Sequence, residues 1–230
     1  MKRVLISAAE EEELVCAKQA FNSLEKMEQD ELDVEFMLTG IGTTSTSYRL
    51  TKILNTVEKP FDFAVNIGIA GSFSADFPIG TVARIEKEFF GDLGFETFSG
   101  FQTLFDYQIL DANTFPYKNG ALNSPTLPDS IERSLSHLKN GIGVTVQTVS
   151  GFPEKTERLI SDFSPQIESM EGAAFFYVCL LEKVPFIELR SVSNEVGERD
   201  RAKWNIPAAL KSLKEATTIL LKSTIQADFK

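Results

Sequence analysis

The sequence has few of the residues from which metal centres and disulfide frameworks are built. Its 230 residues include two cysteines, Cys16 and Cys179, and one histidine, His137. Both cysteines lie in apolar stretches with helical spacing, which is typical of reduced core thiols in a reducing compartment. His137 lies in a polar helical stretch that we expect to be exposed. We therefore expect no metal site, since His and Cys are not clustered, and no catalytic role for His137.

Long apolar runs and an excess of positive charge are also lacking. No apolar run is long enough to span a bilayer. The apolar segment behind Met1 meets four glutamates too early for a secretory signal, so we expect a cytoplasmic protein that does not enter a membrane. The 33 acidic and 23 basic residues give a net charge of −10. This charge repels polyanions, so nucleic acid is not an expected partner.

Strand-like and helical segments alternate along the chain. Strands are expected at residues 4–8, 34–38, 63–68, 80–86, 142–146, 166–170 and 185–192. Helices are expected at residues 10–21, 43–56, 130–138, 155–162, 172–182 and 206–225. The alternation predicts an α/β fold with a central mixed, mostly parallel β-sheet flanked by helices on both faces. Because no linker or repeat interrupts it, we expect one domain over residues 1–230.

Four glutamates, residues 10–13, directly follow the first expected strand. Acidic side chains at a helix start complement the helix dipole, and most of the four need do no more than that. Active sites of α/β folds lie at the carboxyl ends of strands, so one carboxylate could turn inward and act as a general base toward water. The cluster offers no glycine and much negative charge, which disfavours a dinucleotide fold. We therefore expect no cofactor.

Other notable residues stand where later strands are expected to end. Residues 66–71, Asn-Ile-Gly-Ile-Ala-Gly, permit close approach of the backbone to a ligand, although a plain turn would explain them as well. Glu171 precedes a long apolar helix, where a carboxylate is costly unless it is satisfied. It is either held by backbone N–H groups or accepts hydrogen bonds from vicinal hydroxyls, as on a ribose. Asn194 follows another buried strand, near enough to share a pocket.

These motifs together resemble the nucleoside phosphorylase and nucleosidase superfamily. Gly-Ile-Gly at residues 40–42, the turn at 66–71, Ser-Met-Glu-Gly-Ala at 169–173 and Arg-Ser-Val-Ser-Asn at 190–194 follow the order of that family's motifs. The resemblance covers the whole chain. It implies a nucleoside phosphorylase-like fold and cleavage of the N-glycosidic bond of a purine nucleoside.

Residue roles follow from the similarity to methylthioadenosine/S-adenosylhomocysteine nucleosidases within that superfamily. Glu12 matches the glutamate that activates the attacking water, Glu171 the glutamate that binds the ribose hydroxyls, and Met170 a methionine under the ribose. Asn194 stands where those adenine-specific enzymes carry aspartate, and Ile69 where they carry serine. Thr148 and Val149 match residues that frame the base. The other residues expected at the substrate are Ala70, Gly71 and Arg190.

The departures at Asn194 and at the 66–71 turn indicate a particular substrate and nucleophile. Departing adenine presents two donors, N7–H and its amino group, which suit the two acceptors of a carboxylate. Hypoxanthine presents a donor at N7 and an acceptor at O6, which suit an amide. Asn194 therefore favours a 6-oxopurine. The turn has no cation to hold phosphate and the nearby glutamates would repel it, so water is the expected nucleophile.

Both departures fit the futalosine hydrolases, to which the chain is similar in residues 169–176 and in the charged stretch before Trp204. These enzymes release hypoxanthine from futalosine, leaving dehypoxanthine futalosine, in the futalosine pathway of menaquinone biosynthesis. Futalosine has a carboxyphenyl ketone on its 5′ side. Arg199, Arg201 or Lys203 could bind that carboxylate, arginine being preferred for bidentate geometry.

An aromatic slot is expected around the carboxyphenyl group. Its candidate residues are Phe90, Leu93, Phe95, Phe98 and Phe101. A Phe-rich loop also packs well in an interface, and in related nucleosidases a neighbouring subunit closes the 5′ pocket. We therefore expect a homodimer or higher homo-oligomer with the 5′ pocket near the interface. Three alternatives stay open: a methylthioadenosine-type nucleosidase, a phosphorylase, and a catalytically silent nucleoside-binding protein.

Overall fold

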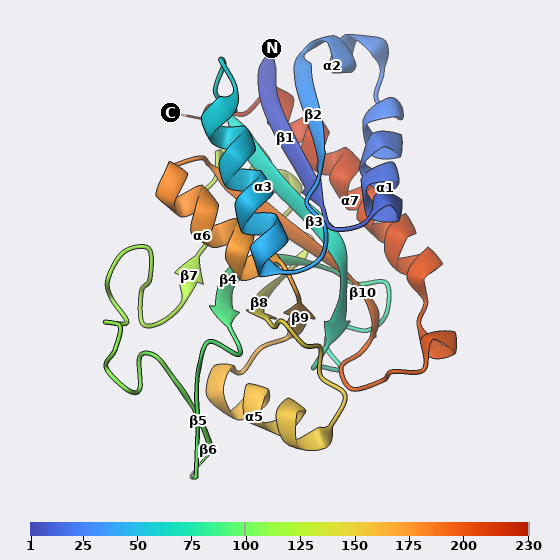
Figure 1. Ribbon diagram of the computed structural model, residues 1–230. Helices are drawn as coiled ribbons and strands as arrows, with labels where there is room; N and C mark the ends of the chain where they lie inside the picture. Colours follow the sequence, from blue (N-terminus) through green and yellow to red (C-terminus); the bar gives the residue numbers. More distant parts are fainter. Residues whose placement is uncertain (99, 230) are drawn as a thin grey trace.

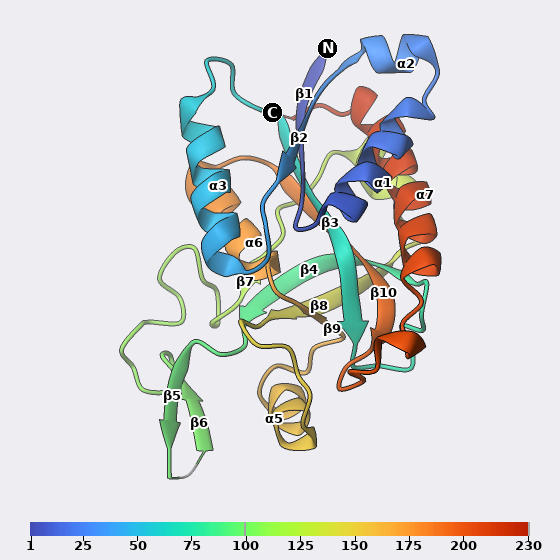
Figure 2. The ribbon, with the colours of Figure 1, turned by 45° about the vertical axis from the view of Figure 1, so that its right-hand side comes forward.

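The computed structural model describes residues 1–98 and 100–229, and its main element is an eight-stranded sheet (Figure 1). The strands of this sheet are β1 (Lys2–Ala8), β2 (Leu32–Leu38), β3 (Phe63–Ser72), β4 (Val82–Phe90), β7 (Leu122–Asn123), β8 (Lys139–Thr145), β9 (Ile167–Ser169) and β10 (Phe186–Glu195). Two further strands, β5 (Gly94–Thr97) and β6 (Gly100–Thr103), form an antiparallel hairpin. The hairpin projects from the body of the molecule (Figure 2).

The main sheet is mixed and mostly parallel, as the sequence predicts. β1 pairs in parallel with β2 and β3, β3 with β10, and β8 with both β4 and β9. The pairs of β10 with β4, β3 with β9, and β4 with β7 are antiparallel. Because β3 pairs with both β9 and β10, the strands β3, β10, β4, β8 and β9 close into a ring, from which β1 and β2 extend.

Helices cover the sheet on both sides. They are α1 (Glu11–Asn22), α2 (Lys26–Asp30), α3 (Thr43–Thr56), α4 (Asp129–Ser134), α5 (Pro153–Phe163), α6 (Gly172–Glu182) and α7 (Ile206–Ile225). α1 and α7 lie together on one face, and α3 and α6 on the other (Figures 1 and 2). One apolar cluster fills each side, with Leu14 and Leu220 in the first and Leu50 and Phe176 in the second. The main sheet contains strands from β1 near the N-terminus to β10 near the C-terminus, and one domain over residues 1–230 stays a prediction.

The predicted strands and helices are present with differences at their ends, and the short elements α2, β5, β6 and β7 were not predicted. The helix expected over residues 130–138 stops at Ser134, because the hydroxyls of Ser134 and Ser136 bond to the carbonyls of Ser130 and Arg133 and favour a turn. His137 lies in that turn and is exposed. The last strand, expected to end at residue 192, continues to Glu195 through a bulge.

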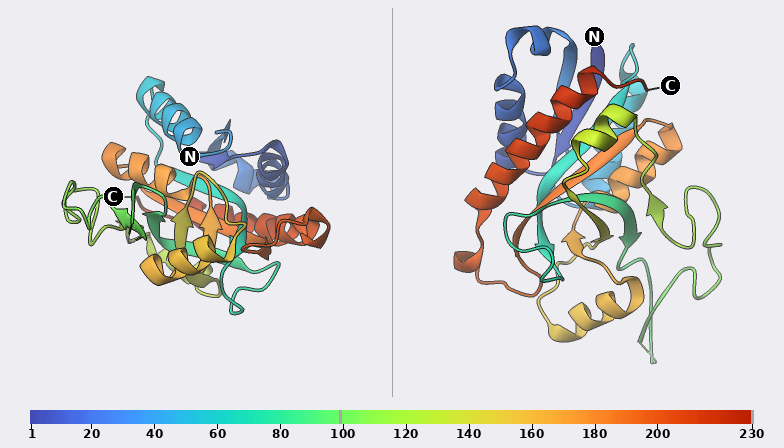
Figure 3. Two further views of the ribbon diagram at one scale, coloured as in Figure 1. Left: turned by 60° about the horizontal axis from the view of Figure 1, so that its bottom comes forward. Right: turned by 180° about the vertical axis from the view of Figure 1, so that it is seen from behind.

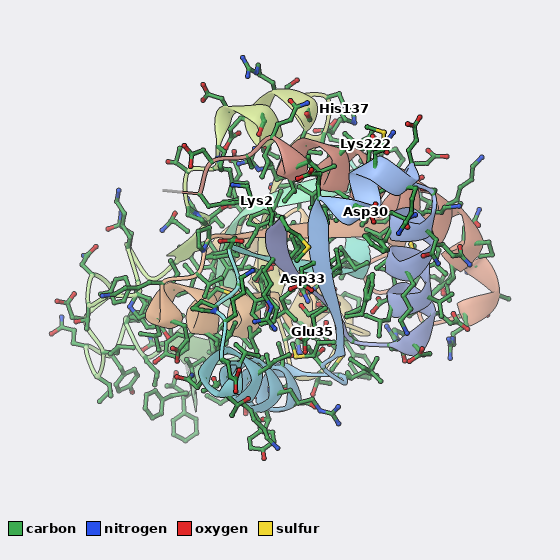
Figure 4. The ribbon with its side chains drawn as sticks, turned by 90° about the horizontal axis from the view of Figure 1, so that it is seen from above. Lys2, Asp30, Asp33, Glu35, His137 and Lys222 are labelled. Atoms are coloured by element: carbon green, nitrogen blue, oxygen red, sulfur yellow. The ribbon has the colours of Figure 1, made fainter. Side chains whose placement is uncertain are left out.

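The carboxyl ends of β1, β3 and β10 point to one end of the molecule. Figure 4 shows the opposite end, where Lys2 begins β1 and where His137 and Lys222 lie. Both chain ends also lie there (Figure 3). Among the described residues, no helix combines the length and apolarity needed to cross a membrane.

Candidate active site

A cavity of about 280 Å³ opens where β1, β3 and β10 end. Its position matches the usual location of ligand sites in α/β folds. Ten predicted site residues line it: Ile69, Ala70, Gly71, Val149, Met170, Glu171, Asn194, Arg199, Arg201 and Trp204. Glu12, Thr148 and Arg190 are not among the lining residues. We call the part around Glu13, Glu171 and Asn194 the strand-end half, and the part around Arg199, Arg201 and Trp204 the loop half.

Glu13, and not the predicted Glu12, turns toward the cavity from α1. Glu13 is 5% exposed, whereas Glu12 is exposed on the outer face of the helix. The helical repeat explains the difference, since Cys16, Ala17 and Ala20 lie on the face of Glu13 and are all buried. The glutamate that reaches the cavity is therefore Glu13, one position after the predicted Glu12.

Three backbone N–H groups hold the Glu13 carboxylate in place. Oε1 accepts a hydrogen bond from Ile69 N at 2.8 Å, and Oε2 accepts from Ala9 N and Glu10 N at 3.1 Å each. Burial raises the pKa of Glu13, an effect that the Ile69 hydrogen bond and the charge of Arg190 partly offset. A carboxylate with three donors keeps a free lone pair, so Glu13 can still accept a proton.

Glu171 caps the start of α6 and contacts the loop before α3. Its Oε1 accepts a hydrogen bond from Gly42 N at 3.0 Å, and its Oε2 lies 3.8 Å from Arg190 Nη1. Gly42 has a φ of +90°, a conformation that residues with a side chain rarely adopt. The second glycine of the Gly-Ile-Gly turn is therefore needed for its backbone conformation. Glu171 is 5% exposed and lines the cavity. Apart from this long ion pair, Oε2 accepts no hydrogen bond in the part of the chain that the structure describes, so it can accept hydrogen bonds from a ligand hydroxyl.

Arg190 lies behind the cavity wall rather than in it. Its guanidinium is buried and donates to Glu188 Oε1 and to Asn66 Oδ1, both at 2.5 Å. Burial opposes the charge, but the carboxylates of Glu188, Glu171 and Glu13 raise the pKa of Arg190 overall. Arg190 therefore does not line the cavity as predicted. Its positive charge instead lies near the carboxylates of Glu13 and Glu171.

The glycines of the 66–71 turn make room for side chains. A Cβ on Gly68 would lie 2.0 Å from Arg190 Nη1, and a Cβ on Gly71 would lie 3.4 Å from Asn194 Nδ2 and 3.0 Å from a methyl group of Val196. Gly68 thus allows Arg190 to approach Glu13. The sequence had suggested a close approach of backbone to a ligand, and at Gly68 the close approach is made by a guanidinium.

Two neighbours fix the side-chain amide of Asn194. Nδ2 donates to the carbonyl of Glu195 at 2.8 Å, and Oδ1 accepts from the hydroxyl of Ser193 at 2.8 Å. A carbonyl oxygen can face only a donor, so the contact with Glu195 sets which end of the amide carries nitrogen. Asn194 keeps one free N–H and one free lone pair. A carboxylate in its place would bring two oxygens together at 2.8 Å.

Glu168 is a buried residue of the cavity that the sequence did not single out. It accepts hydrogen bonds from Ser150 N at 3.1 Å and from the Ser150 hydroxyl. Burial raises its pKa, against the opposing effect of Ser150 and of the charges on Lys155 and Arg199. Val149 lines the same cavity, whereas Thr148 is exposed and is not among the lining residues.

The loop half of the cavity carries the positive charge. Arg199 and Arg201 stack on Trp204, with 5.2 and 5.8 Å between each guanidinium carbon and the ring centre. Trp204 donates its Nε1–H to the carbonyl of Glu198 at 3.0 Å, which anchors this cluster. Lys203 pairs with Glu198 at 2.6 Å and does not line the cavity. The two arginines, rather than Lys203, are therefore placed to meet an anionic ligand.

The predicted aromatic slot does not form within one chain. Phe90, Leu93, Phe95, Phe98 and Phe101 are absent from the lining of this cavity. Phe95 and Phe98 lie on the projecting hairpin and its tip and are exposed (Figure 2). For Phe95 and Phe101 the reason is that β5 and β6 pair with each other rather than with the main sheet. Phe90, at the end of β4, and Leu93 line a different cavity, beside the start of α3.

Seven lining residues were missed from the sequence: Ala9, Glu10, Glu13, Ile41, Glu168, Ser169 and Ser193. The buried face of α1 would have identified Glu13. Ser169 and Ser193 each stand beside a predicted residue in a strand that ends at the cavity. Ile41 lies in the Gly-Ile-Gly motif at residues 40–42, whereas Glu168 carries no such signal. Within residues 1–98 and 100–229, no group of three or more His, Cys, Asp or Glu is arranged to hold a metal ion.

The strand-end half therefore combines a desolvated base, a carboxylate with a free oxygen and an oriented amide. These groups suit proton abstraction from water, binding of a diol and a two-point contact with a heterocycle.

Comparison with known proteins gives a consistent picture. A family model for the phosphorylase superfamily matches residues 11–226. Futalosine hydrolase of Thermus thermophilus is 32% identical over 186 residues, which cover 81% of this chain and 80% of that protein.

Two solved structures share the fold. Futalosine hydrolase of Helicobacter pylori superposes with a TM-score of 0.74 at 18% identity, covering 98% of this chain and 97% of that chain. The 5′-methylthioadenosine/S-adenosylhomocysteine nucleosidase of S. pneumoniae superposes with a TM-score of 0.77 at 18% identity, covering 96% and 99%.

Proposed function

The chain belongs to the phosphorylase superfamily, and on that premise we propose that it hydrolyses the N-glycosidic bond of futalosine and releases hypoxanthine. The 32% identity with a futalosine hydrolase over four-fifths of both chains supports this substrate. The reaction leaves dehypoxanthine futalosine, an intermediate of menaquinone biosynthesis.

Glu13 is the general base of the proposed reaction. Its raised pKa brings the carboxyl group closer to the working range of a base. The three backbone N–H groups hold it rigidly, so that a water molecule beside it faces C1′ of the ribose. The water attacks C1′ as the bond to N9 breaks, and one proton of the water passes to Glu13. The departing hypoxanthine takes up a proton at N7 from solvent and leaves as the neutral base, and Glu13 returns its proton to solvent afterwards. The sugar gains oxocarbenium character, which carboxylates nearby stabilise.

Glu171 and Met170 bind the ribose. The free Oε2 of Glu171 accepts hydrogen bonds from the 2′ and 3′ hydroxyls, while Gly42 holds Oε1. Met170 is half-buried beside it and offers an apolar surface to the sugar ring. The nearby negative charge also favours the positive charge that develops on the sugar in the transition state.

Asn194 selects the leaving group, and this is the observation that carries the choice of a 6-oxopurine. The free lone pair on Oδ1 accepts the hydrogen bond from N7–H, and the remaining N–H of Nδ2 donates to O6. The Glu195 carbonyl enforces this arrangement of donor and acceptor. Adenine would instead set its amino group against Nδ2, a donor against a donor. Ile69, Ala70, Gly71 and Val149 enclose the base.

Arg201 binds the 5′ carboxylate of the substrate. Arg199 lies close enough to Glu168 to lower its pKa, so part of its charge is already compensated. Arg201 and Arg199 both stack on Trp204, whose ring offers an apolar face to the phenyl group.

A second copy of the chain completes the site in the homo-oligomer that we propose, with the 5′ pocket near the interface. Phe95 is 41% exposed, and Phe98 is exposed at the hairpin tip. Apolar side chains gathered on a projecting hairpin are typical of interfaces. The free, buried Cys16 and Cys179 are in keeping with a reducing, cytoplasmic location.

The test is chromatography of the products formed from futalosine in phosphate-free buffer. Hypoxanthine and dehypoxanthine futalosine are expected to form at the same rate as in phosphate buffer. A requirement for phosphate would contradict hydrolysis and establish a phosphorylase. Binding of futalosine by calorimetry without release of a base would establish a silent binding protein instead.

A further inference from the structure

Two buried glutamates lie behind the cavity and have no part in the reaction described so far. Glu88 on β4 and Glu188 on β10 are both fully buried. They face Arg190, which also faces Glu13 and Glu171 at the cavity. Four carboxyl groups therefore surround one guanidinium. If all were ionised, this buried cluster would carry a large uncompensated negative charge, which a low-dielectric interior disfavours.

Glu88 and Glu188 are close neighbours across the start of α6. The position that a Cβ would take on Gly172 lies 2.3 Å from Glu88 Oε1 and 2.6 Å from Glu188 Oε1. The corresponding position on Gly143 lies 2.0 Å from Glu88 Oε1. The space of one methyl group thus separates the two carboxyl groups. The glycine of the Met-Glu-Gly signature is required here because a side chain would collide with both.

The hydrogen bonds differ between the two carboxyl groups. Glu188 Oε1 accepts from Arg190 Nε at 2.5 Å, which favours the ionised form of Glu188. Glu88 has no such cation, and its Oε2 accepts from the Thr145 hydroxyl at 2.8 Å. Thr145 in turn accepts from Ala173 N, so its hydroxyl hydrogen points at Glu88. A proton on Glu88 therefore belongs on Oε1.

Among the described residues, one buried oxygen of each group lacks a hydrogen-bond partner, namely Glu88 Oε1 and Glu188 Oε2. A buried polar atom without a partner is unusual and calls for an explanation. A proton on Glu88 Oε1 turns one acceptor into a donor beside the other group. Burial and the charge of Glu188 both raise the pKa of Glu88, which agrees with this placement.

We propose that Glu88 and Glu188 carry one proton between them, held on Glu88, and that this acid pair positions Arg190 relative to the two cavity carboxylates. Glu88 is neutral and Glu188 is ionised. Glu188 holds Arg190 at Nε, so that Nη1 stays 3.8 Å from Glu171 Oε2 instead of closing on it. Glu171 therefore keeps an oxygen for the ribose. This consequence for substrate rests on the proposed function, whereas the shared proton does not.

The shared proton is tested by infrared difference spectroscopy on the full chain at neutral pH. The variant is Glu88→Gln, and the matched control is Glu86→Gln, an exposed glutamate two residues earlier on β4. Wild type minus Glu88→Gln is expected to show the C=O band of a protonated carboxyl group, shifted in D₂O. Wild type minus Glu86→Gln is expected to show carboxylate bands. Carboxylate bands in both differences would overturn the proposal.

Proton release on unfolding gives a second readout. Because Glu88 holds its proton to a higher pH in the folded chain than in the unfolded chain, its contribution to stability is lost as pH rises through its folded pKa. The wild type is therefore expected to release one proton more on unfolding at neutral pH than Glu88→Gln. If Glu88→Gln does not fold, the protonated-carboxyl band must still be present in the wild type, and its absence there contradicts the proposal.

The positioning role is tested with Glu188→Gln, which lets Arg190 close on Glu171. We expect KM for futalosine to rise about tenfold, with a smaller change in kcat, because substrate loses the free Glu171 oxygen. A purely structural role would lower the folded fraction and leave KM unchanged. That outcome would overturn the positioning role. Failure of futalosine to react at all would contradict the proposed function and leave the infrared result standing.

Discussion

The strand-end and loop halves of the cavity are built in opposite ways. Glu13, Glu171 and Asn194 are nearly fully buried, and neighbouring backbone groups fix each of them. Arg199 and Arg201 are exposed and stack on Trp204. Trp204 directly follows the short 3₁₀ helix η1 (Arg201–Lys203), and Arg199 precedes it. Rigid, desolvated groups suit bond breaking, which depends on fixed geometry. An exposed cluster suits recognition of one part of a substrate and tolerates change.

The largest effect is expected at the general base. Glu13→Gln should lower kcat for futalosine by about 10²–10⁴-fold, since an amide cannot take the proton of water. Glu12→Gln should leave kcat within about twofold, because Glu12 is exposed on the other face of α1. Steady-state kinetics of this pair measures the difference. Equal losses of kcat in the two variants would contradict the assignment of the base to Glu13 rather than Glu12.

Asn194→Asp is expected to lower kcat/KM for futalosine by about 10–100-fold. A carboxylate oxygen would face the Glu195 carbonyl and the other would face O6 of hypoxanthine, at a cost of about 1–3 kcal/mol. Parallel assays with futalosine and methylthioadenosine measure the change in preference. An unchanged rate with futalosine would show that the amide is not the base-selecting group.

Lowering the pH should reduce the catalytic activity of the strand-end half before the protein unfolds. The water can be activated only while Glu13 is ionised, and burial raises the pKa of Glu13 above the usual 4.5. kcat/KM should therefore fall about tenfold per pH unit below that raised pKa. A pH profile of the wild type locates the acid limb. A limb at or below 4.5 would exclude Glu13 as the base.

Gly172→Ala should reduce the free energy of unfolding by about 1–3 kcal/mol, because the added methyl group collides with Glu88 and Glu188. Gly141→Ala is the matched control, since the nearest atom to its Cβ is 3.6 Å away. Denaturant titration compares the two. Equal losses would show that the space around Gly172 is not restricted by the acid pair.

The smallest effect is expected in the loop half. Arg201→Ala should raise KM for futalosine about fivefold, as an exposed ion pair contributes about 1 kcal/mol or less. KM for inosine, which has no 5′ carboxylate, should not change. Arg199→Ala should have the weaker effect, because Glu168 partly compensates its charge. An equal rise for inosine would place Arg201 at another part of the substrate.

The sequence predicts the strand-end half better than the loop half and the interior. Buried runs and helical spacing locate most of the strands and helices, and the signature motifs locate Glu171 and Asn194. The resemblance to related nucleosidases assigns the base to Glu12 rather than Glu13, and four consecutive glutamates offer no local contrast that would correct the assignment. Only the register of the buried face, through Cys16 and Ala17, separates them.

Two other features depend on contacts between distant strands, which a sequence does not display. Glu88 and Glu188 are 100 residues apart and meet because β4 pairs with β10. The hairpin aromatics were expected in the cavity because their composition suits an aryl group. Their pairing into β5 and β6 carries them away from it.

Competition between futalosine and methylthioadenosine tests the central claim most directly. Equal amounts of both are given to the wild type in phosphate-free buffer, and the released bases are separated by chromatography. The orientation of Asn194 predicts that hypoxanthine accumulates while methylthioadenosine stays intact. Release of adenine as the main product would contradict the assignment of the substrate and favour a methylthioadenosine-type nucleosidase.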